Sequence, residues 1–308
     1  TVIGAGNVGA TVANVVAEKE LANEVILLDI KEGISEGKAL DMWQTAPINS
    51  YDTRLIGSTN DYSLTKDSDI VVITSGLPRK PGMSRDDLIS TNAGIVKSVT
   101  ENVMKHSSNP ILIVVSNPLD VMTYCAYLTS GLPSSRVMGM ACILDTARYR
   151  AFLATELNCS PKDIQAMLLG GHGDTMVPLP RYTTVSGIPV TEFISEEKLT
   201  PILERTKQGG GELVKLMGTS AWYAPGTAAA QMVESIVRDQ KRIFPVCAWL
   251  DGQYGMDKIY LGVPVKLGKD GIEEIIELKL NEGEKKLLDE SAVAVREVMG
   301  VYDNRMKG

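Results

Sequence analysis

The 308-residue sequence predicts an α/β fold in which a doubly wound parallel sheet is followed by a second α/β unit with antiparallel strands. Strand-like and helix-like segments alternate through the first half, and two of the strand-like segments (70–74 and 111–115) are continuously apolar. Such runs are typical of parallel strands covered on both faces. The 44% of hydrophobic and 22% of charged residues supply buried cores and exclude a disordered or coiled-coil chain.

The first half is expected to form alternating strands and helices. Apolar residues recur at helical spacing in each helix, as Val8, Val12 and Val15 do in the first. In chain order, strands are expected at 1–3, 24–29, 53–58, 69–74 and 111–116, and helices at 7–19, 36–44, 88–106 and 119–130. Because the sequence begins inside an apolar stretch, we expect a few residues of the first strand to precede Thr1.

The second half has a different pattern. Its expected elements are helices at 145–156, 196–217, 221–241 and 282–299, a strand at 165–169, a hairpin within 178–190, and an antiparallel meander at 243–250, 259–267 and 272–280. Ser160-Pro161 is typical of a helix start. The three glycines at 209–211 should interrupt one helix, and Gly300 should end the last. We place the domain boundary near residue 142, which gives units over 1–142 and 143–308.

The charge balance and the cysteines exclude several classes of protein. The net charge of −7 gives no general electrostatic reason to bind nucleic acid or an anionic membrane surface. No apolar run approaches the roughly 18 residues of a membrane-spanning helix, and no secretory signal is visible. Cys125, Cys142, Cys159 and Cys247 lack the spacing of a metal knuckle, so we expect no metal site and four thiols in a reducing compartment. These features favour a cytoplasmic protein.

A glycine-rich turn follows the first strand and opens the first helix. Its residues are Gly4, Ala5, Gly6, Asn7, Val8 and Gly9. In a GxGxxG turn of this kind the glycines permit a tight turn, a close approach to a pyrophosphate, and packing of the helix on the sheet. Asp29 ends the next strand, where a carboxylate binds ribose hydroxyls and repels a 2′-phosphate. We therefore expect NAD rather than NADP, although Lys31 is close by; a glycine-rich turn with a surface aspartate is the alternative.

His172 is the candidate for proton transfer. It follows a strand on a loop rich in glycine (170–174), where ligands collect in α/β proteins, and its imidazole titrates near neutral pH. His106 ends a long expected helix in a polar stretch, which is typical of a solvated residue. Asp145 is the candidate that orients His172, and Arg148 lies on the same helix face. A structural histidine and an ordinary helix-end Asp–Arg pair are the alternatives.

The segment 77–85 follows a buried strand and is rich in proline and glycine. It carries three cations, Arg79, Lys80 and Arg85. In a chain of net charge −7, such a cluster suggests a lid that closes on an anion. A solvated basic loop is the alternative.

Several motifs occur in order: GAGNVG (4–9) with Asp29, GLPRKPGMSRDDL (76–88), VSNPLDVMTY (115–124), ILDTARYR (143–150) and GGHGDTMVP (170–178). Together they resemble the malate dehydrogenases of the bacterial type that is similar to lactate dehydrogenases, and the resemblance covers essentially the whole chain. It implies an NAD-binding Rossmann-type domain over 1–142 and a substrate-binding and catalytic α/β domain over 143–308. It also implies an oxidoreductase of the tricarboxylic acid cycle that reversibly oxidises (S)-malate to oxaloacetate with NAD, acting as a homo-oligomer, with a tetramer favoured over a dimer.

The resemblance also implies roles for the site residues. His172 matches the family's acid/base, and Asp145 matches its partner. Arg148 matches the arginine that clamps the carboxylate beside the reacting carbon, and Arg85 matches the lid arginine that polarises the carbonyl. Asn117 matches a residue that touches both the substrate and the nicotinamide.

Three further positions bear on specificity and on the cofactor. Arg79 matches the position that discriminates between substrates, where lactate dehydrogenases carry glutamine. Asn92 and Val115 match positions that line the cofactor site. L-lactate dehydrogenase, or another 2-hydroxyacid dehydrogenase, is therefore the alternative function. A non-catalytic NAD-binding or scaffold protein is a third class, but it would have no reason to hold the histidine, its aspartate and the arginines together.

Overall fold

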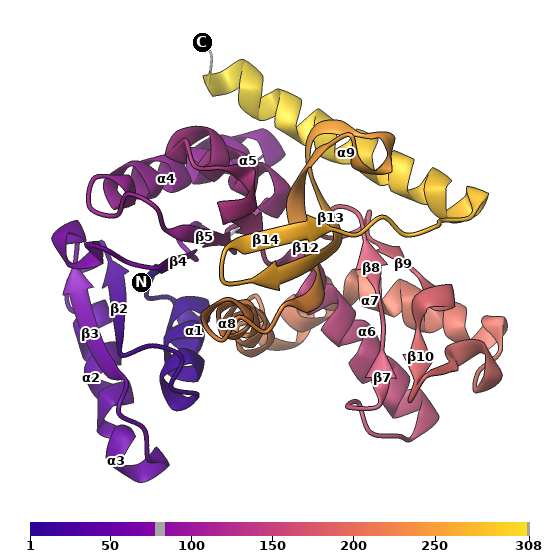
Figure 1. Cartoon of the computed structure of the whole chain (residues 1–308), viewed down its shortest axis with the longest axis horizontal. Coiled ribbons are helices and arrows are strands. Elements are labelled where there is room, and N and C mark those ends of the chain that lie inside the picture. Colours follow the sequence, from indigo (N-terminus) through magenta and orange to yellow (C-terminus); the bar gives the residue numbers. More distant parts are fainter. Residues whose placement is uncertain (78–83, 307–308) are drawn as a thin grey trace.

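In the part of the chain that the structure describes, nine strands form one mixed sheet (Figure 1). The computed structural model describes residues 1–77 and 84–306. The parallel strands stand in the order β3-β2-β1-β4-β5-β6. Their bounds are β1 Val2–Ile3, β2 Glu24–Asp29, β3 Arg54–Thr59, β4 Ile70–Ile73, β5 Ile111–Val114 and β6 Val137–Gly139. This order defines a doubly wound sheet, so the predicted fold class is confirmed.

The centre of the sheet is formed by the strands with continuous apolar sequences. All four residues of β5 are buried, and three of the four in β4 are. The strand β6 was not among the expected elements, because its three residues are too few to carry a recognisable pattern.

Helices cover both faces of the parallel strands, with α4 and α5 above the sheet and α1 and α8 below it in Figure 1. The helices of the first half are α1 Asn7–Glu18, α2 Ile34–Gln44, α3 Ala46–Asn49, α4 Arg85–Met104 and α5 Leu119–Ser130. The helix α4 begins three residues before its expected start. Ser84 and Asp87 form a capping box there, in which the Ser84 hydroxyl accepts the Asp87 N–H at 3.1 Å.

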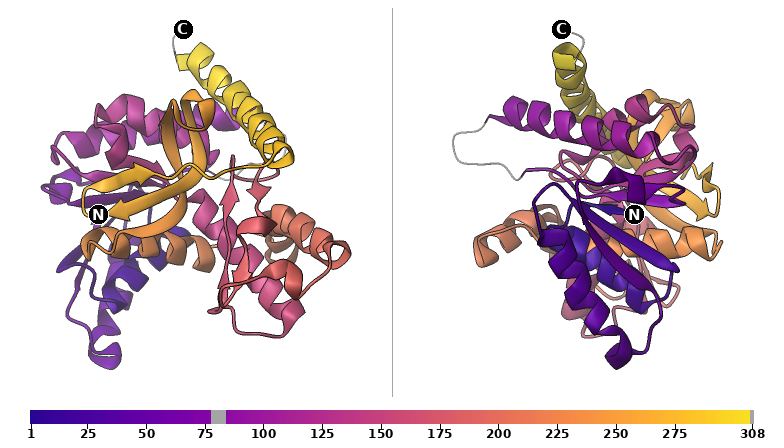
Figure 2. Two further views of the ribbon diagram at one scale, coloured as in Figure 1. Left: turned by 45° about the vertical axis from the view of Figure 1, so that its right-hand side comes forward. Right: turned by 90° about the vertical axis from the view of Figure 1, so that its left-hand side faces the viewer.

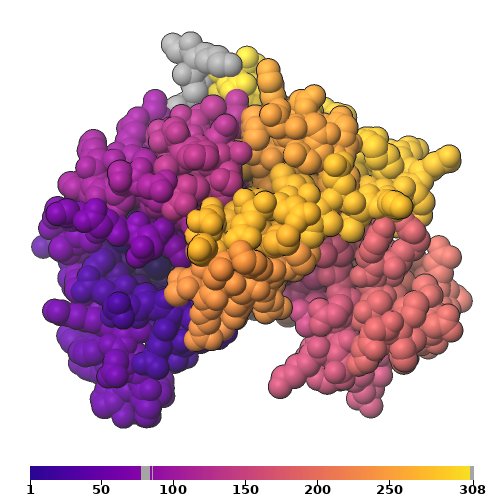
Figure 3. Space-filling view, viewed as in Figure 1, coloured from indigo at the N-terminus to yellow at the C-terminus, as the bar shows by residue number. Residues whose placement is uncertain are grey.

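The helices of the second half are α6 Ala141–Leu157, α7 Glu196–Met217, α8 Tyr223–Val237 and α9 Glu282–Met306, and its short strands are β7 Ile164–Gln165, β8 Leu168–Leu169, β9 Val177–Pro178, β10 Thr184–Val185 and β11 Ile188–Pro189. The helices α6 and α7 and the short strands form a lobe, which Figure 3 shows set apart below the meander, whereas α8 and α9 lie outside it. Short 3-10 turns lie at Tyr62–Thr65, Ser134–Arg136, Pro180–Tyr182, Val190–Glu192 and Gln253–Gly255. The expected strand at 165–169 is split between β7 and β8, whereas the expected hairpin is confirmed by the antiparallel pair β10–β11.

The expected meander is present, and it extends the parallel sheet. It consists of β12 Arg242–Asp251, β13 Asp257–Gly268 and β14 Gly271–Ile275, all antiparallel. It joins the sheet where Cys247 of β12 pairs with Gly139 of β6. A Cβ at Gly139 would lie 2.9 Å from the Cys247 Cβ, so glycine allows the two strands to meet. One sheet therefore spans residues on both sides of position 142.

Two expected helix breaks are wrong. The helix α7 continues through the glycines at 209–211, and α9 continues through Gly300 to Met306. Glycine weakens a helix by about 1 kcal/mol relative to alanine, which tertiary packing overrides here. Tyr302, beyond Gly300, is buried in the core, and this packing holds the last turns of α9.

The expected helix start at Ser160-Pro161 is also wrong. Residues 160–163 form a turn, in which the Asp163 N–H donates to the Ser160 carbonyl at 3.1 Å, and β7 follows. A proline after a serine suits a turn as well as a first helical position, so the local pattern does not distinguish the two.

The helix α9 ties the two halves together. It packs on β9 at one end and on α4 and α5 at the other, and Figure 2 shows it crossing the outside of the molecule. Within residues 1–77 and 84–306, no helix combines the length and the apolar character that crossing a membrane requires.

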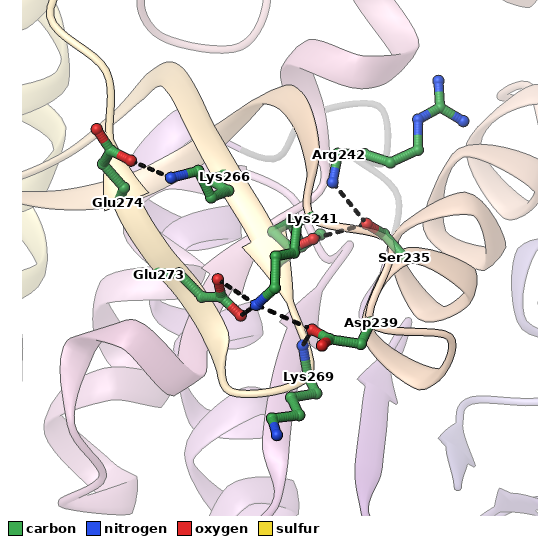
Figure 4. Close-up of polar contacts among 9 residues, drawn as sticks. Ser235, Asp239, Lys241, Arg242, Lys266, Lys269, Glu273 and Glu274 are labelled. Carbon is green, nitrogen blue, oxygen red and sulfur yellow. Dashed lines mark hydrogen bonds and ion pairs between the residues drawn. The ribbon is translucent and has the colours of Figure 1, made fainter.

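A polar cluster fastens the outer end of the meander to α8 (Figure 4). The Ser235 hydroxyl of α8 donates to the Leu267 carbonyl of β13 at 2.7 Å. Lys241 pairs with Glu273 of β14 at 2.8 Å and with Asp239 at 3.3 Å. We call Asp239, Lys241 and Glu273 the meander cluster; their side chains are 37%, 49% and 19% exposed.

Candidate active site

The candidate residues collect at the carboxyl ends of the parallel strands. The glycine turn follows β1, Asp29 ends β2, and Val115 and Asn117 follow β5. In doubly wound sheets the crevice at these strand ends is where ligands bind. The sheet topology therefore brings together residues that are far apart in the sequence.

The glycine turn has the geometry of a dinucleotide cradle. Gly4 has a φ of +106°, and a Cβ there would lie 2.7 Å from the Thr74 hydroxyl. A Cβ at Gly9 would lie 1.8 Å from the Gly4 carbonyl oxygen, so glycine is needed for α1 to approach the turn. At Gly6 a Cβ would meet no atom within 4 Å, and Gly6 caps α1 without a side-chain hydrogen bond. Open space and unpartnered helix N–H groups suit a pyrophosphate.

Backbone groups hold the Asp29 carboxylate in one orientation. Its Oδ2 accepts the Ala5 N–H at 2.6 Å, and its Oδ1 accepts the Lys31 N–H at 2.9 Å. A carboxylate offers about four acceptor positions, so further positions remain for ribose hydroxyls. The geometry fits the role predicted for Asp29.

A histidine, an aspartate and an arginine form a connected ion cluster, which we call the Asp145 cluster. The Asp145 Oδ2 lies 2.9 Å from Nδ1 of His172, and its Oδ1 accepts from Arg148 Nη1 at 3.2 Å. Asp145 is fully buried in α6, whereas the His172 side chain is 21% exposed to solvent. Because Asp145 engages Nδ1, the ring presents Nε2 to the cavity, which is the arrangement of a base oriented by a carboxylate.

The loop that carries His172 is fixed by backbone bonds. Gly170 has a φ of +87° and exchanges backbone hydrogen bonds with Gly262 of β13. The Gly171 N–H donates to the Ser291 hydroxyl of α9 at 2.8 Å. These bonds place the imidazole beside Asp145, so the glycines that flank His172 serve a specific loop conformation.

Sequence reasoning missed Asp120. This buried carboxylate in α5 accepts the His172 N–H at 3.2 Å with Oδ2, and its Oδ1 contacts the Cys247 thiol at 3.2 Å. Burial raises the pKa of the Asp120 carboxyl, although Cys247 and His172 oppose the rise. The available signal was an acidic residue within the apolar run that opens α5, since buried carboxylates need partners.

The surroundings of His172 shift its proton affinity. Burial by itself lowers the pKa of the imidazole, but the charge and hydrogen bond of Asp145 and the charge of Asp120 outweigh it. The net result is a pKa raised above the ordinary value of 6.5. The site therefore stabilises the protonated ring relative to a free imidazole, which suits a group that both gives and accepts a proton.

Arg148 faces a cavity of about 1040 Å³ that is also lined by His172, Asn117, Val115 and Val8. Its guanidinium lies against the glycines of α7: a Cβ at Gly209 would be 3.1 Å from Arg148 Cδ. This close contact explains the glycine at position 209, whereas a Cβ at Gly211 would meet no atom within 4 Å. Within the described part of the chain, the buried Arg148 Nε has no hydrogen-bond partner.

Asn92 of α4 is buried and links two loops. It is 1% exposed, and its amide donates to the carbonyls of Leu77 and Asn117 at 3.1 and 2.7 Å. It also accepts the Leu77 N–H at 2.8 Å. The base of the cationic segment is thereby tied to the loop after β5.

The remaining candidates lie in or beside the cationic segment. Arg79 and Lys80 are outside the described residues. The backbone of Arg85 begins α4, and the structure does not describe its side chain. The described geometry therefore brings together the glycine turn, Asp29, Val115, Asn117, Asp145, Arg148 and His172.

A dinucleotide cradle that opens toward an aspartate-backed histidine defines a dinucleotide-dependent oxidoreductase. Residues 1–139 match the model of the lactate/malate dehydrogenase NAD binding domain, and residues 142–301 match that of the lactate/malate dehydrogenase alpha/beta C-terminal domain. The chain belongs to the lactate/malate dehydrogenase family, and its first domain is the family's NAD-binding domain.

Relatives and solved structures agree with this family. The malate dehydrogenase of Cytophaga hutchinsonii is 72% identical over 303 residues, which cover 98% of this chain and 97% of the relative. The structure of the malate dehydrogenase from Salinibacter ruber has a TM-score of 0.96 at 55% identity, covering 99% and 98% of the two chains. A lactate dehydrogenase from Cryptosporidium parvum, solved with lactic acid and NAD, has a TM-score of 0.94 at 39% identity, covering 98% and 97%. Fold alone therefore does not separate the two activities.

Proposed function

We propose that the protein is an NAD-dependent malate dehydrogenase that reversibly oxidises (S)-malate to oxaloacetate, a reaction of the tricarboxylic acid cycle. The observation that carries the proposal is the pair formed by His172 and the fully buried Asp145, at a cavity that Val8 of the dinucleotide helix also lines. The names of the close relatives support malate as the substrate.

His172 and Asp145 carry the proton transfer. When malate is oxidised, neutral His172 accepts the hydroxyl proton at Nε2, and Asp145 stabilises the imidazolium that forms. In the reverse direction the imidazolium donates this proton to the carbonyl oxygen of oxaloacetate. NAD, when bound, supplies the hydride acceptor, and NADH supplies the donor in the reverse reaction.

Arginines recognise the two carboxylates and the reacting carbonyl. Arg148 has a planar guanidinium that can bind a carboxylate through two parallel hydrogen bonds, and its position at the cavity supports this role. Arg85 polarises the carbonyl, Asn117 contacts the substrate and the nicotinamide, and Arg79 binds the distal carboxylate. These three roles rest on the family motifs.

The cofactor is held along the strand ends. The residues that we assign to it are Gly4, Ala5, Gly6, Asn7, Val8, Gly9, Asp29, Asn92, Val115 and Asn117. Asp29 favours NAD over NADP, because its oriented carboxylate accepts ribose hydroxyls and repels a 2′-phosphate. The buried Asn92 acts through the loops that it links.

The direct test is NADH consumption with oxaloacetate and with pyruvate. We expect a kcat/KM that is orders of magnitude higher with oxaloacetate. A preference for pyruvate would make the protein a lactate dehydrogenase, and no turnover with either keto acid would favour the non-catalytic class. Oxidation of NADPH at the rate of NADH would contradict the role of Asp29.

Arg79 is expected to set the substrate preference, because oxaloacetate and pyruvate differ only in the distal carboxylate. Arg79→Gln should lower kcat/KM for oxaloacetate by orders of magnitude and raise it for pyruvate, since pyruvate no longer leaves an enclosed cation unpaired. Lys80→Gln is the matched control, because adjacent side chains in an extended segment point to opposite sides. If Lys80→Gln changes the preference and Arg79→Gln does not, the assignment is wrong.

Three further assignments complete the proposal. Residues 1–142 bind the dinucleotide, and residues 143–308 supply the catalytic groups and Arg148. The cytoplasm is the compartment, which the four free cysteines support. The protein is a homo-oligomer, with a tetramer favoured over a dimer; the exposed Leu40, Trp43 and Ile48 near the start of the chain support association. Light scattering on the purified protein tests this, and a monomer contradicts it.

A further inference from the structure

A lysine of α2 reaches across to the dinucleotide turn. The Lys38 Nζ donates to the carbonyl oxygen of Ala5 at 2.8 Å. Lys38 is half-buried, and within the described part of the chain its ammonium forms no ion pair with a carboxylate. A cation whose partner is a backbone carbonyl in the middle of the GxGxxG turn calls for an explanation beyond helix stability.

We propose that Lys38 is a positioning residue of the dinucleotide site, which sets the turn for the pyrophosphate and contributes positive charge beside it. The proposal rests on the NAD site proposed above, in which Lys38 has no assigned role.

Two consecutive peptide groups of the turn are each held by a hydrogen bond to a different side chain. The Gly4–Ala5 peptide is held through its N–H by Asp29 at 2.6 Å. The Ala5–Gly6 peptide is held through its carbonyl by Lys38. In a planar trans peptide the N–H points opposite to the carbonyl, so drawing the Ala5 oxygen toward α2 turns the Gly6 N–H away from α2. A Cβ at Gly6 would meet no atom within 4 Å, so a pyrophosphate can approach the Gly6 N–H through this open space.

The position of Lys38 is itself rigid. The Ser35 hydroxyl, one turn earlier in α2, donates to the Ser58 carbonyl of β3 at 2.8 Å. Gly57 of β3 lies so close that a Cβ there would be 2.2 Å from the Ser35 carbonyl oxygen. Because the start of α2 is fixed to the sheet, the backbone of Lys38 is held at a defined distance from the turn.

The charge of Lys38 adds to this geometric effect. NAD brings a pyrophosphate with two negative charges, and the nearby Asp29 carboxylate opposes it. An ammonium group held next to the turn offsets that repulsion, and its effect on a partly buried ligand is screened less than at the open surface.

The test compares Lys38→Met, which keeps the apolar stem without the donor, with Lys38→Arg, which keeps a charged donor. NADH binding is followed by fluorescence titration, and ADP-ribose is used as a competitive inhibitor. For Lys38→Met we expect the Kd of NADH and the inhibition constant of ADP-ribose to rise in parallel by roughly tenfold, which is about 1.4 kcal/mol. The kcat at saturating NADH should change less than about twofold, and Lys38→Arg should recover most of the affinity.

Lys31→Met is the comparison for charge. It removes a cation from the same end of the site, and within the described residues the Lys31 side chain makes no hydrogen bond. We expect it to weaken NADH binding far less than Lys38→Met does. If Lys38→Met does not fold, Lys38→Gln, whose shorter stem does not reach Ala5, replaces it.

Three outcomes would overturn the inference. These are unchanged NADH affinity in Lys38→Met, equal losses in the Lys31 and Lys38 variants, and a fall in kcat without a change in NADH affinity. Failure of the unaltered protein to bind NADH would overturn the cofactor site as well, so the two failures are distinguishable.

Discussion

Two charged clusters in this protein have nearly the same distances and very different surroundings. In the Asp145 cluster the contacts are 2.9 and 3.2 Å, and in the meander cluster they are 2.8 and 3.3 Å. Asp145 is fully buried, whereas the Lys241 side chain is 49% exposed. Contact geometry alone therefore does not separate a candidate catalytic cluster from a surface ion pair (Figure 4).

The difference lies in the dielectric environment and in access to a cavity. Exposed ion pairs are screened by water and contribute little to stability. Removing one partner of a buried pair is strongly destabilising, by roughly 3–5 kcal/mol, because it leaves an uncompensated charge. Only the Asp145 cluster combines burial of the carboxylate with a cavity in front of its partners. The comparison predicts large functional effects at one cluster and small effects at the other.

The largest effect is expected for His172→Asn. Turnover should fall by roughly 100-fold or more, which is the contribution of a positioned acid/base. NADH binding should persist, because His172 meets the substrate and not the adenine end of the cofactor. Steady-state kinetics and NADH titration check the two statements, and near-normal turnover would falsify the assignment.

The next effect is expected for Asp145→Asn, and it includes a shift with pH. Asp145 raises the pKa of His172, so in the unaltered protein the protonated ring persists above pH 6.5. Oxaloacetate reduction should decline, and malate oxidation should increase, as pH rises through that raised pKa. In the variant both transitions should move to lower pH, and reduction near neutral pH should fall by about tenfold or more. A pH profile of kcat/KM checks this, and an unshifted profile would return Asp145 to a purely structural role.

The same pKa shift has a consequence for stability. Because the folded-state pKa of His172 is raised, the stabilisation by the charged ring is fully present below about pH 6.5 and is lost as pH rises through the folded pKa. Asp145→Asn should reduce this part of the pH dependence, because only the charge of Asp120 then raises the pKa of His172. Unfolding midpoints in urea across this pH range measure it.

A smaller effect is expected for Gly209→Ala, with opposite signs for stability and substrate binding. Alanine should stabilise α7 by about 0.5–1 kcal/mol relative to glycine in mid-helix. Its Cβ, 3.1 Å from Arg148 Cδ, should displace the guanidinium and raise KM for oxaloacetate severalfold. Gly300→Ala in α9 is the matched control, because a Cβ there meets no atom within 4 Å. Equal KM values in both variants would show that Arg148 tolerates the contact.

The smallest effect is expected in the meander cluster. Lys241→Gln and Glu273→Gln should leave kcat and KM unchanged and shift the urea midpoint only slightly, since the Lys241 side chain is 49% exposed and water screens the pair. The small shift should disappear in high salt. A loss of stability comparable to that of Asp145→Asn would mean that solvent exposure does not predict the energetic contribution of an ion pair in this protein.

Much of the fold was accessible from the sequence because its signals are local. The apolar runs that form β4 and β5 and the helical spacing of α1 are short-range patterns, and so is the alternation that gives the doubly wound order. The wrong expectations at 209–211 and Gly300 arose where a local signal conflicts with packing. Gly209 of α7 accommodates Arg148, and the end of α9 is held by Tyr302.

The sequence by itself determined the dinucleotide turn, Asp29 and the set of candidate catalytic residues, because their identity and order express the chemistry directly. Only the tertiary structure decided that Asp120 holds the backbone of His172 and that Lys38 reaches the Ala5 carbonyl. It also decided that the meander joins the parallel sheet at Gly139. The physical reason is that these contacts join residues 33, 52 and 108 positions apart. Their distances are set by the packing of whole strands and helices, which local periodicity does not encode.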